Sequence, residues 1–188
     1  GGIRSTMESI HIHYDEWFSQ ASIEESSAVA ETVADLQAKG IVTEEDGALW
    51  FESEQFGDPR ERRVLRKSNG DYTYLAGDIA YHRNKFLVRG FDRVINVWGA
   101  DHHGQVASLV AGVRALGIDG DRIEVRLGQM ISLTSGKMSK RAGNVVDLDD
   151  VVADIGADAT RLLSLLTSID QSVTIDLDKV RSESKESP

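Results

Sequence analysis

Apolar residues recur with helical spacing in two segments of the first two thirds of the chain. Val29, Val33 and Leu36 fall on one face of a helix over residues 27–39, and residues 103–116 repeat this pattern before a glycine. A glycine directly after the last apolar position is a typical helix end. Both segments are therefore predicted to be amphipathic helices.

The second predicted helix lies between two short runs that are typical of strands. Residues 94–98 are rich in β-branched side chains, and residues 123–127 alternate apolar and polar positions and continue to Ile131. A strand, a helix and a strand at this spacing predict a βαβ unit with a parallel sheet covered by helices. The expected fold class is α/β, with ligands at the carboxyl ends of the strands.

The first half of the chain carries two more strand-like runs. Residues 48–56 and 63–74 are expected to form short strands, and Asn69-Gly70 predicts a hairpin turn within the second run.

The pattern after residue 144 is helical. An apolar stripe at 151–155 is followed by the leucines of 162–166, whose wide apolar face predicts a largely buried helix. Residues 173–178 are expected to add one short strand.

Composition narrows the class of protein. Of 188 residues, 40% are hydrophobic and 28% charged, which is typical of a globular protein and argues against a disordered chain. No apolar run reaches the roughly 18 residues of a membrane helix, and neither a leader segment nor a cysteine is present, so a cytoplasmic protein is expected. The 21 basic and 31 acidic residues give a net charge of −10, so only a local basic cluster is expected to bind a polyanion.

One dense basic cluster lies in this acidic chain. Residues 135–144 hold three cations, among them Lys137 and Lys140, together with Ser139, two glycines and the apolar Met138. Lysines supply charge to phosphate oxygens, and glycines let the backbone approach them. Because the cluster follows a predicted strand, it is interpreted as a phosphate-binding loop, with a solvated surface loop as the alternative.

A second candidate site is the glycine-containing turn at residues 99–104. Asp101 can accept hydrogen bonds from ribose hydroxyls, and the following helix offers its positive end to a nucleotide. A metal site formed by Asp101, His102 and His103 is an alternative, since carboxylate and imidazole are transition-metal ligands. A simple helix cap by Asp101 is the other.

A third candidate is the pair Tyr74 and Asp78, four residues apart around Gly77. If a helix has begun by Tyr74, both side chains share one face. A carboxylate beside a phenol can bind a cationic side chain, best a guanidinium through paired hydrogen bonds. The alternative is structural, with Asp78 complementing the helix dipole and Tyr74 in the core.

Taken together, these segments resemble a known family. Residues 137–141 are similar to the second signature, KMSKS, of class I aminoacyl-tRNA synthetases. Four further segments, in the same order, resemble the bacterial arginyl-tRNA synthetases: residues 46–50, 72–82, 98–104 and 156–161. The resemblance extends over nearly the whole chain.

The resemblance implies a domain organisation. Residues 1–144 are expected to be the C-terminal part of a Rossmann-like catalytic domain, including an inserted helix and small β region at about 27–70. Residues 145–188 are expected to form a helical stem-contact segment and connector.

The resemblance also implies an arginine–tRNA ligase as the parent protein. L-arginine and ATP, with Mg²⁺, would form arginyl-adenylate, and the arginyl group would pass to tRNA(Arg). Lys137 and Lys140 would stabilise the pyrophosphate leaving group. The implied ATP-binding residues are Gly99, Asp101, His102, Met138 and Ser139, and the implied arginine-binding residues are Tyr74, Asp78 and Gln20. No protein-bound metal or membrane contact is implied, and the parent is expected to be a monomer.

Two features depart from the family pattern. The first signature, HIGH, is missing, because residues 11–14 match a segment downstream of it. Gln20 stands where the family commonly has glutamate, and a neutral amide keeps the hydrogen bond without the ionic contribution. Since the family's anticodon-binding domain is also missing, the chain alone is expected not to charge tRNA.

Three alternative functions stay open at this point. The first is a synthetase-like binding module without catalysis. The second is a class I synthetase for another amino acid such as cysteine or glutamate, and the third is a metal hydrolase built on Asp101, His102 and His103. Asp78 argues against the second alternative, and the third requires a bound transition metal.

Overall fold

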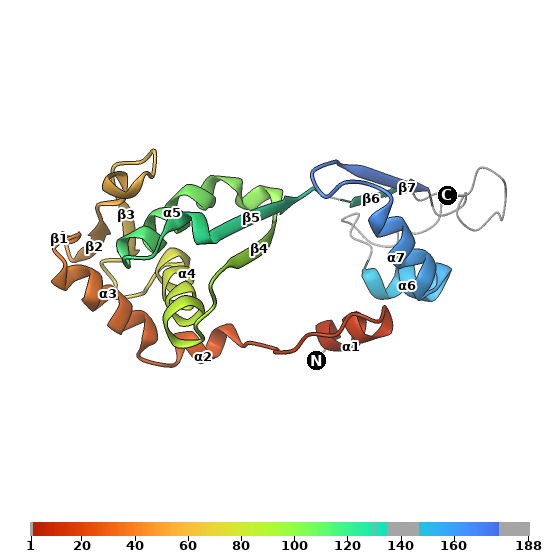
Figure 1. Cartoon of the computed structure of the whole chain (residues 1–188), viewed down its shortest axis with the longest axis horizontal. Helices are drawn as coiled ribbons and strands as arrows, with labels where there is room; N and C mark the ends of the chain where they lie inside the picture. The colour runs from red at the N-terminus through yellow and green to blue at the C-terminus, as the bar shows by residue number, and fades with distance from the viewer. Residues whose placement is uncertain (1, 130, 135–146, 177–188) are drawn as a thin grey trace. The chain divides into compact units, whose positions relative to one another are not determined.

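The computed structural model describes residues 2–129, 131–134 and 147–176. Chain contacts divide it into two units: the central unit of residues 18–126, and the terminal unit of residues 1–17 and 127–188. Figure 1 shows the elements of both units along the chain.

The central unit contains four α-helices and most of the strands. The helices are α2 (Gln20–Glu24), α3 (Ala28–Ala38), α4 (Tyr74–Arg83) and α5 (Val106–Ala115), with 3₁₀ turns at Ser53–Phe56, Ala100–Gln105 and Gly120–Arg122 and a π-helical turn at Asn84–Val88. The strands are β1 (Val42–Glu45), β2 (Ala48–Phe51), β3 (Arg63–Arg66), β4 (Val94–Gly99) and β5 (Ile123–Gly128), the last of which ends in the terminal unit.

The core of the central unit lies where α4 packs between α3 and α5. Leu36, Ile79 and Leu109 contribute fully buried side chains, one from each helix. A Cβ at Gly112 would lie 2.5 Å from the Cδ1 atom of Ile79, so only glycine lets α5 approach α4 this closely. The predicted helix at 27–39 is confirmed as α3, whereas the helix predicted from residue 103 begins as a 3₁₀ turn and becomes α-helical at Val106.

The strands β1, β2 and β3 form an antiparallel sheet in that order. The strand predicted over 48–56 ends at Phe51, because a 3₁₀ turn follows and Ser53 donates its hydroxyl to the Arg60 carbonyl at 3.1 Å. The hairpin at residues 69–70 is confirmed by a single bridge between Arg66 and Tyr72, after which the chain turns helical instead of extending to residue 74. Sequence inspection missed β1, which has one buried residue and three exposed polar ones.

The predicted strand–helix–strand unit is confirmed by β4, α5 and β5, since β4 and β5 are neighbours in one sheet. Along β4 the side chains alternate, with Val94 and Asn96 buried and Ile95 and Val97 exposed. The carboxyl end of β4 leads directly into the predicted turn at residues 99–104.

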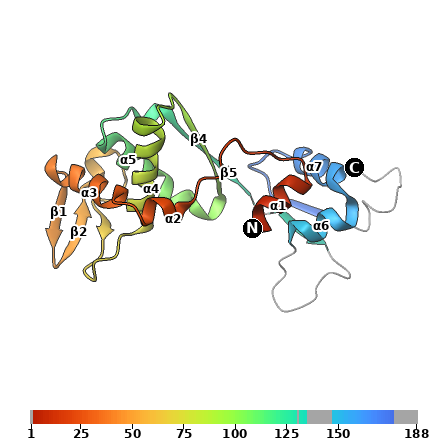
Figure 2. The ribbon, with the colours of Figure 1, turned by 90° about the horizontal axis from the view of Figure 1, so that it is seen from below.

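The terminal unit contains α1 (Gly2–Ser9), α6 (Leu148–Ile155), α7 (Ala157–Leu165) and the parallel pair β6 (Ile131–Thr134) and β7 (Val173–Asp176). Figure 2 shows α1, α6 and α7 gathered beside these strands, and Arg161 of α7 donates to the Ile10 carbonyl at 2.7 Å. The strand predicted over 173–178 is confirmed as β7 over residues 173–176, and residues 177–178 lie outside the described residues. The run predicted from residue 123 to residue 131 is instead two strands with different partners.

The predicted burial of the α7 leucines is wrong. Leu163 is buried, but Leu162, Leu165 and Leu166 are exposed. Within the described part of the terminal unit, α7 packs chiefly on α6.

Candidate functional site

The central unit holds an open cavity of about 980 Å³ between α2, the β1–β3 sheet, α4 and the start of α5. Gln20, Tyr74 and Asp78, the three predicted arginine-binding residues, all line it. Two residues 54 positions apart in the chain, Gln20 and Tyr74, thus contribute to one cavity wall. The structure places Gln20, which only the family resemblance had associated with Tyr74 and Asp78, at the same cavity as that pair.

The first turn of α4 fixes Tyr74 and Asp78 in this cavity. Thr73 caps the helix, since its hydroxyl accepts a hydrogen bond from the Ala76 amide at 3.4 Å. The same hydroxyl donates to the Val64 carbonyl of β3 at 2.9 Å. The helix therefore begins at Tyr74 and is tied to the sheet there, so Tyr74 and Asp78 share one helical face as predicted.

The Asp78 carboxyl group is partly buried, whereas Tyr74 is 82% exposed. Burial raises the pKa of the Asp78 carboxyl, while the charges of Lys85 and His102 lower it in part. A cation bound to this carboxylate would compensate for the lost hydration. Tyr74 is available to a ligand, and the alternative that places it in the core is wrong.

Gln20 lies in the first turn of α2, and its side-chain amide donates to the Glu24 carboxylate at 2.6 Å. Both side chains line the cavity. Although residue 20 carries no charge, the carboxylate of Glu24 lies one turn further along the same helix. The side-chain oxygen of Gln20 is oriented by this bond and remains an acceptor.

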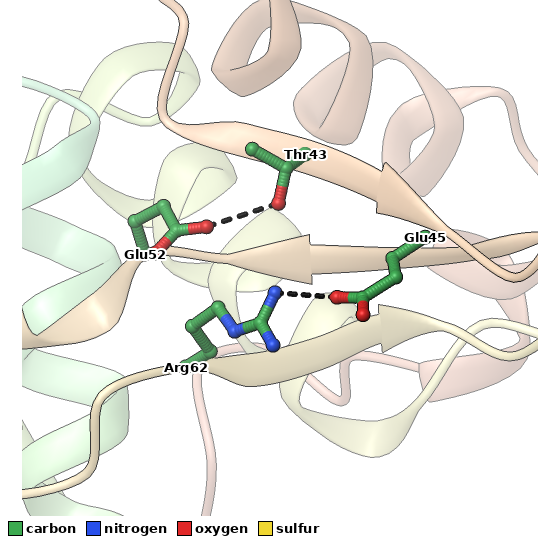
Figure 3. Close-up of polar contacts among 4 residues, drawn as sticks. All are labelled: Thr43, Glu45, Glu52 and Arg62. Atoms are coloured by element: carbon green, nitrogen blue, oxygen red, sulfur yellow. Dashed lines mark hydrogen bonds and ion pairs between the residues drawn. The ribbon is translucent and has the colours of Figure 1, made fainter.

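The sheet side of the cavity is formed by Trp50 and Arg62, together with Arg63 and Lys67. Figure 3 shows Arg62 reaching across the sheet to Glu45, with 2.7 Å between Nη1 and Oε2, beside a Thr43–Glu52 hydrogen bond of 2.9 Å. The Arg62 guanidinium also lies 5.1 Å from the Trp50 ring centroid. Arg62 is thus already paired with a carboxylate and an aromatic ring.

The end of β4 and the turn that follows it hold the predicted ATP-binding residues Gly99, Asp101 and His102. The Asp101 carboxylate is 80% exposed, and its Oδ2 atom lies 3.6 Å from Nε2 of His102. The Asp101 Oδ1 atom lies 2.4 Å from where a Cβ at Gly99 would be, so the Asp101 carboxylate folds back over the strand end. The turn ends at Gln105, which lines the cavity with Asp78.

The remaining predicted site residues, Lys137, Met138, Ser139 and Lys140, lie outside the described residues. Among the residues that are described, no group of three histidine, aspartate or glutamate side chains is arranged to hold a metal ion. In the same ranges, every helix is too short or too polar to cross a membrane.

Sequence analysis missed other members of this region. Trp50, Glu24 and Gln105 line the cavity, and His82 lies buried one helical turn beyond Asp78. The spacing of residues 74, 78 and 82 places three polar side chains on one face of α4, and this was the available signal for His82.

Comparison with known proteins identifies the family. The family model described as "tRNA synthetases class I (R), catalytic domain" matches residues 6–178. The chain belongs to this class I arginyl-tRNA synthetase family. The match includes both the cavity residues and the basic cluster at 135–144.

Relatives in the family are identical to this chain at close to half of the aligned positions. An arginine–tRNA ligase of Moorella thermoacetica is 48% identical over 99% of the chain and 34% of its own length. One from Caldanaerobacter subterraneus is 46% identical over 94% of the chain and 32% of its length. The chain thus spans about a third of the curated relatives that it matches.

Solved structures agree with the α/β fold. A Campylobacter jejuni protein assigned as an arginyl-tRNA synthetase superposes with a TM-score of 0.86 at 36% identity, over 98% of this chain and 40% of its own. The arginyl-tRNA synthetase of Thermus thermophilus superposes with a TM-score of 0.80 at 16% identity, over 94% of this chain and 40% of its own, which supports the fold alone. The chain is part of a Rossmann-like class I synthetase catalytic domain.

Proposed function

We propose that the full-length protein containing this chain is an arginine–tRNA ligase that acts as a monomer in the cytoplasm. It activates L-arginine with ATP, supplied as its Mg²⁺ complex, and transfers the arginyl group to tRNA(Arg). The observation that carries the proposal is the cavity in which Asp78, Tyr74 and Gln20 converge. Family membership supports the same reaction.

The Asp78 carboxylate binds the arginine guanidinium in this proposal. A carboxylate that is partly buried and accessible from a cavity suits a planar cation with paired N–H donors. The exposed phenol of Tyr74 lies one turn earlier on the same helix, and Gln20 offers an amide oxygen from α2. Lysine, with a compact ammonium group, makes fewer directed bonds at such a site.

The activation step joins arginine to the α-phosphorus of ATP. A carboxylate oxygen of arginine attacks this phosphorus, the bond to the bridging oxygen of the β-phosphate breaks, and pyrophosphate leaves with the electron pair. Lys137 and Lys140 stabilise the negative charge that builds on pyrophosphate. Gly99, Asp101, His102, Met138 and Ser139 hold the nucleotide, with the exposed Asp101 carboxylate accepting ribose hydroxyls.

The transfer step uses a ribose hydroxyl of the terminal adenosine of tRNA. Its oxygen attacks the arginyl carbonyl, the bond to the phosphate oxygen breaks, and AMP leaves. Residues 1–144 supply this part of the catalytic domain, with the inserted region at about 27–70, and residues 145–188 contact the tRNA stem. The 188-residue chain by itself is inactive.

Amino-acid-dependent ATP–pyrophosphate exchange by the full-length protein tests the proposal. Exchange is expected with arginine and not with lysine, cysteine or glutamate. Exchange driven by cysteine or glutamate instead would show a class I synthetase of another specificity. If no amino acid supports exchange while arginine and ATP still bind, the protein is a binding module.

A further inference from the structure

A buried polar network lies behind the candidate arginine site. His82 of α4 is 2% exposed and Asn96 of β4 is 7% exposed. The His82 Nδ1 atom lies 2.8 Å from the Asp78 backbone carbonyl oxygen, and its Nε2 atom lies 3.0 Å from the Asn96 side-chain nitrogen. The Lys85 ammonium lies 3.0 Å from the Asn96 side-chain oxygen. Four residues thus form a chain from Lys85 to Asp78.

The direction of every bond in this network follows from the chemistry of its end groups. A backbone carbonyl only accepts, so Nδ1 of His82 must carry the proton. A lysine ammonium only donates, so the Asn96 oxygen faces Lys85 and its amide nitrogen donates to the unprotonated Nε2 atom. The Asn96 oxygen is also 3.2 Å from Nε2, but no proton lies between them. The neutral tautomer of His82 with its proton on Nδ1 satisfies the contacts with the Asp78 carbonyl and the Asn96 amide, and it leaves the Asn96 oxygen to accept from Lys85.

The surroundings keep His82 in this state at neutral pH. Burial, and then the charge of Lys85, lower the pKa of His82 to about 4. Lys85 is itself held by a second contact, because its ammonium lies 4.3 Å from the Tyr81 ring centroid. The Tyr81 ring stacks on the Phe18 ring, with 4.5 Å between the ring centroids, and Phe18 lies shortly before Gln20 in the chain.

The network joins the two halves of the proposed active site. Asn96 lies three residues before Gly99 on β4, the strand that leads into the proposed ATP turn. Its partner His82 is bonded to Asp78, whose carboxylate faces the cavity. A shift of α4 along β4 would break the His82–Asn96 bond, and two buried polar groups would lose their partners.

We propose that His82, Asn96 and Lys85 are positioning residues, which hold Asp78 at a fixed place relative to β4 so that arginine meets ATP in reacting geometry. This inference rests on the proposed function, since it assigns these residues a role in the same site. His82 is bonded to the Asn96 side chain on β4 and to the backbone carbonyl of Asp78. It therefore couples the position of Asp78 to that of β4. The substrate does not contact His82, because its side chain is buried.

Steady-state exchange kinetics of the full-length protein test the role in catalysis. His82→Leu removes both hydrogen bonds and is expected to raise the KM for arginine about tenfold, with the KM for ATP within about twofold. His82→Asn places an amide N–H close to the position of Nδ1 and is expected to restore most of the loss. His13→Leu, the matched change at an exposed histidine, is expected to leave both constants unchanged.

Long-range ¹H–¹⁵N correlation NMR of the unmodified full-length protein tests the network without any variant. At neutral pH the His82 ring is expected to show a protonated Nδ1 and an unprotonated Nε2. Asn96→Asp replaces the amide donor with an acceptor, and both ring nitrogens are then expected to carry protons. A wild-type ring protonated at Nε2 would overturn the network.

Asp78→Asn separates failure of this inference from failure of the proposed function. If this change raises the KM for arginine while His82→Leu leaves it unchanged, His82 does not position Asp78 although the arginine site stands. An equal rise in the KM values for arginine and ATP in His82→Leu would show a general structural role instead. If neither variant affects arginine, the assignment of Asp78 itself is wrong.

Discussion

Replacing Asp78 by asparagine isolates the charge on which arginine recognition depends. The substitution keeps the shape of the side chain and its accepting oxygen but removes the negative charge. A hydrogen bond to a charged group contributes about 1.5–3 kcal/mol to the free energy of binding. Because Asp78 is only partly buried, we take about 2 kcal/mol as the loss in arginine binding. Since each 1.36 kcal/mol corresponds to a factor of ten, the KM for arginine should rise about 30-fold.

The rise of about 30-fold is a lower limit because of Lys85 and His102. Their charges act on the Asp78 carboxyl, and they would oppose the substrate cation once residue 78 carries no negative charge. The assay is arginine-dependent ATP–pyrophosphate exchange by the full-length protein, with the KM for arginine and for ATP measured separately. Asp71→Asn is the matched control, since Asp71 lines the same cavity but is exposed in the hairpin turn and bonded to Asn69. Equal effects of the two variants on the KM for arginine would refute the reasoning.

Three further predictions concern pH and packing. The KM for arginine should rise as the pH falls through the raised pKa of Asp78, because the cation binds the ionised carboxylate. Asp78→Asn should abolish this rise. If the rise persists in Asp78→Asn, another group causes the pH dependence. Phe51→Ala should lower the free energy of unfolding of the chain by about 3–5 kcal/mol in urea denaturation, since Phe51 is fully buried, and a loss under about 1 kcal/mol would contradict its place in the core. Gly112→Ala should lower the free energy of unfolding by about 1–3 kcal/mol because its Cβ would overlap Ile79. Gly77→Ala, with open space around it, should stabilise α4 by up to about 1 kcal/mol. A greater loss of stability in Gly77→Ala than in Gly112→Ala would contradict the α4–α5 packing.

Local patterns predicted the parts of the fold that carry strong periodicity. The helix α3 and the β4–α5–β5 unit follow from apolar spacing alone, because each buries one defined face. β1 was missed since a strand with one buried residue has no alternation to detect. The leucines of α7 were predicted as buried because composition does not indicate which neighbours are present to cover them.

The candidate site was predicted less evenly. Tyr74 and Asp78 could be paired from their spacing, because four residues on a helix bring two side chains to one face. Gln20, from a distant helix, was associated with them only through resemblance to a family, since no local pattern encodes a contact across 54 positions. Asn96 was missed for the same reason, because it reaches His82 from a different element.

The central claim of the proposed function is that Asp78 binds arginine and that Lys137 and Lys140 bind the triphosphate. A crystal structure of the full-length protein with arginine and a non-hydrolysable ATP analogue tests it most directly. The account predicts the guanidinium nitrogens at about 3 Å from the Asp78 carboxylate, with both lysine ammonium groups on the phosphates of the adjacent nucleotide. Arginine bound away from Asp78, or a nucleotide whose phosphates lie far from both lysines, would contradict it.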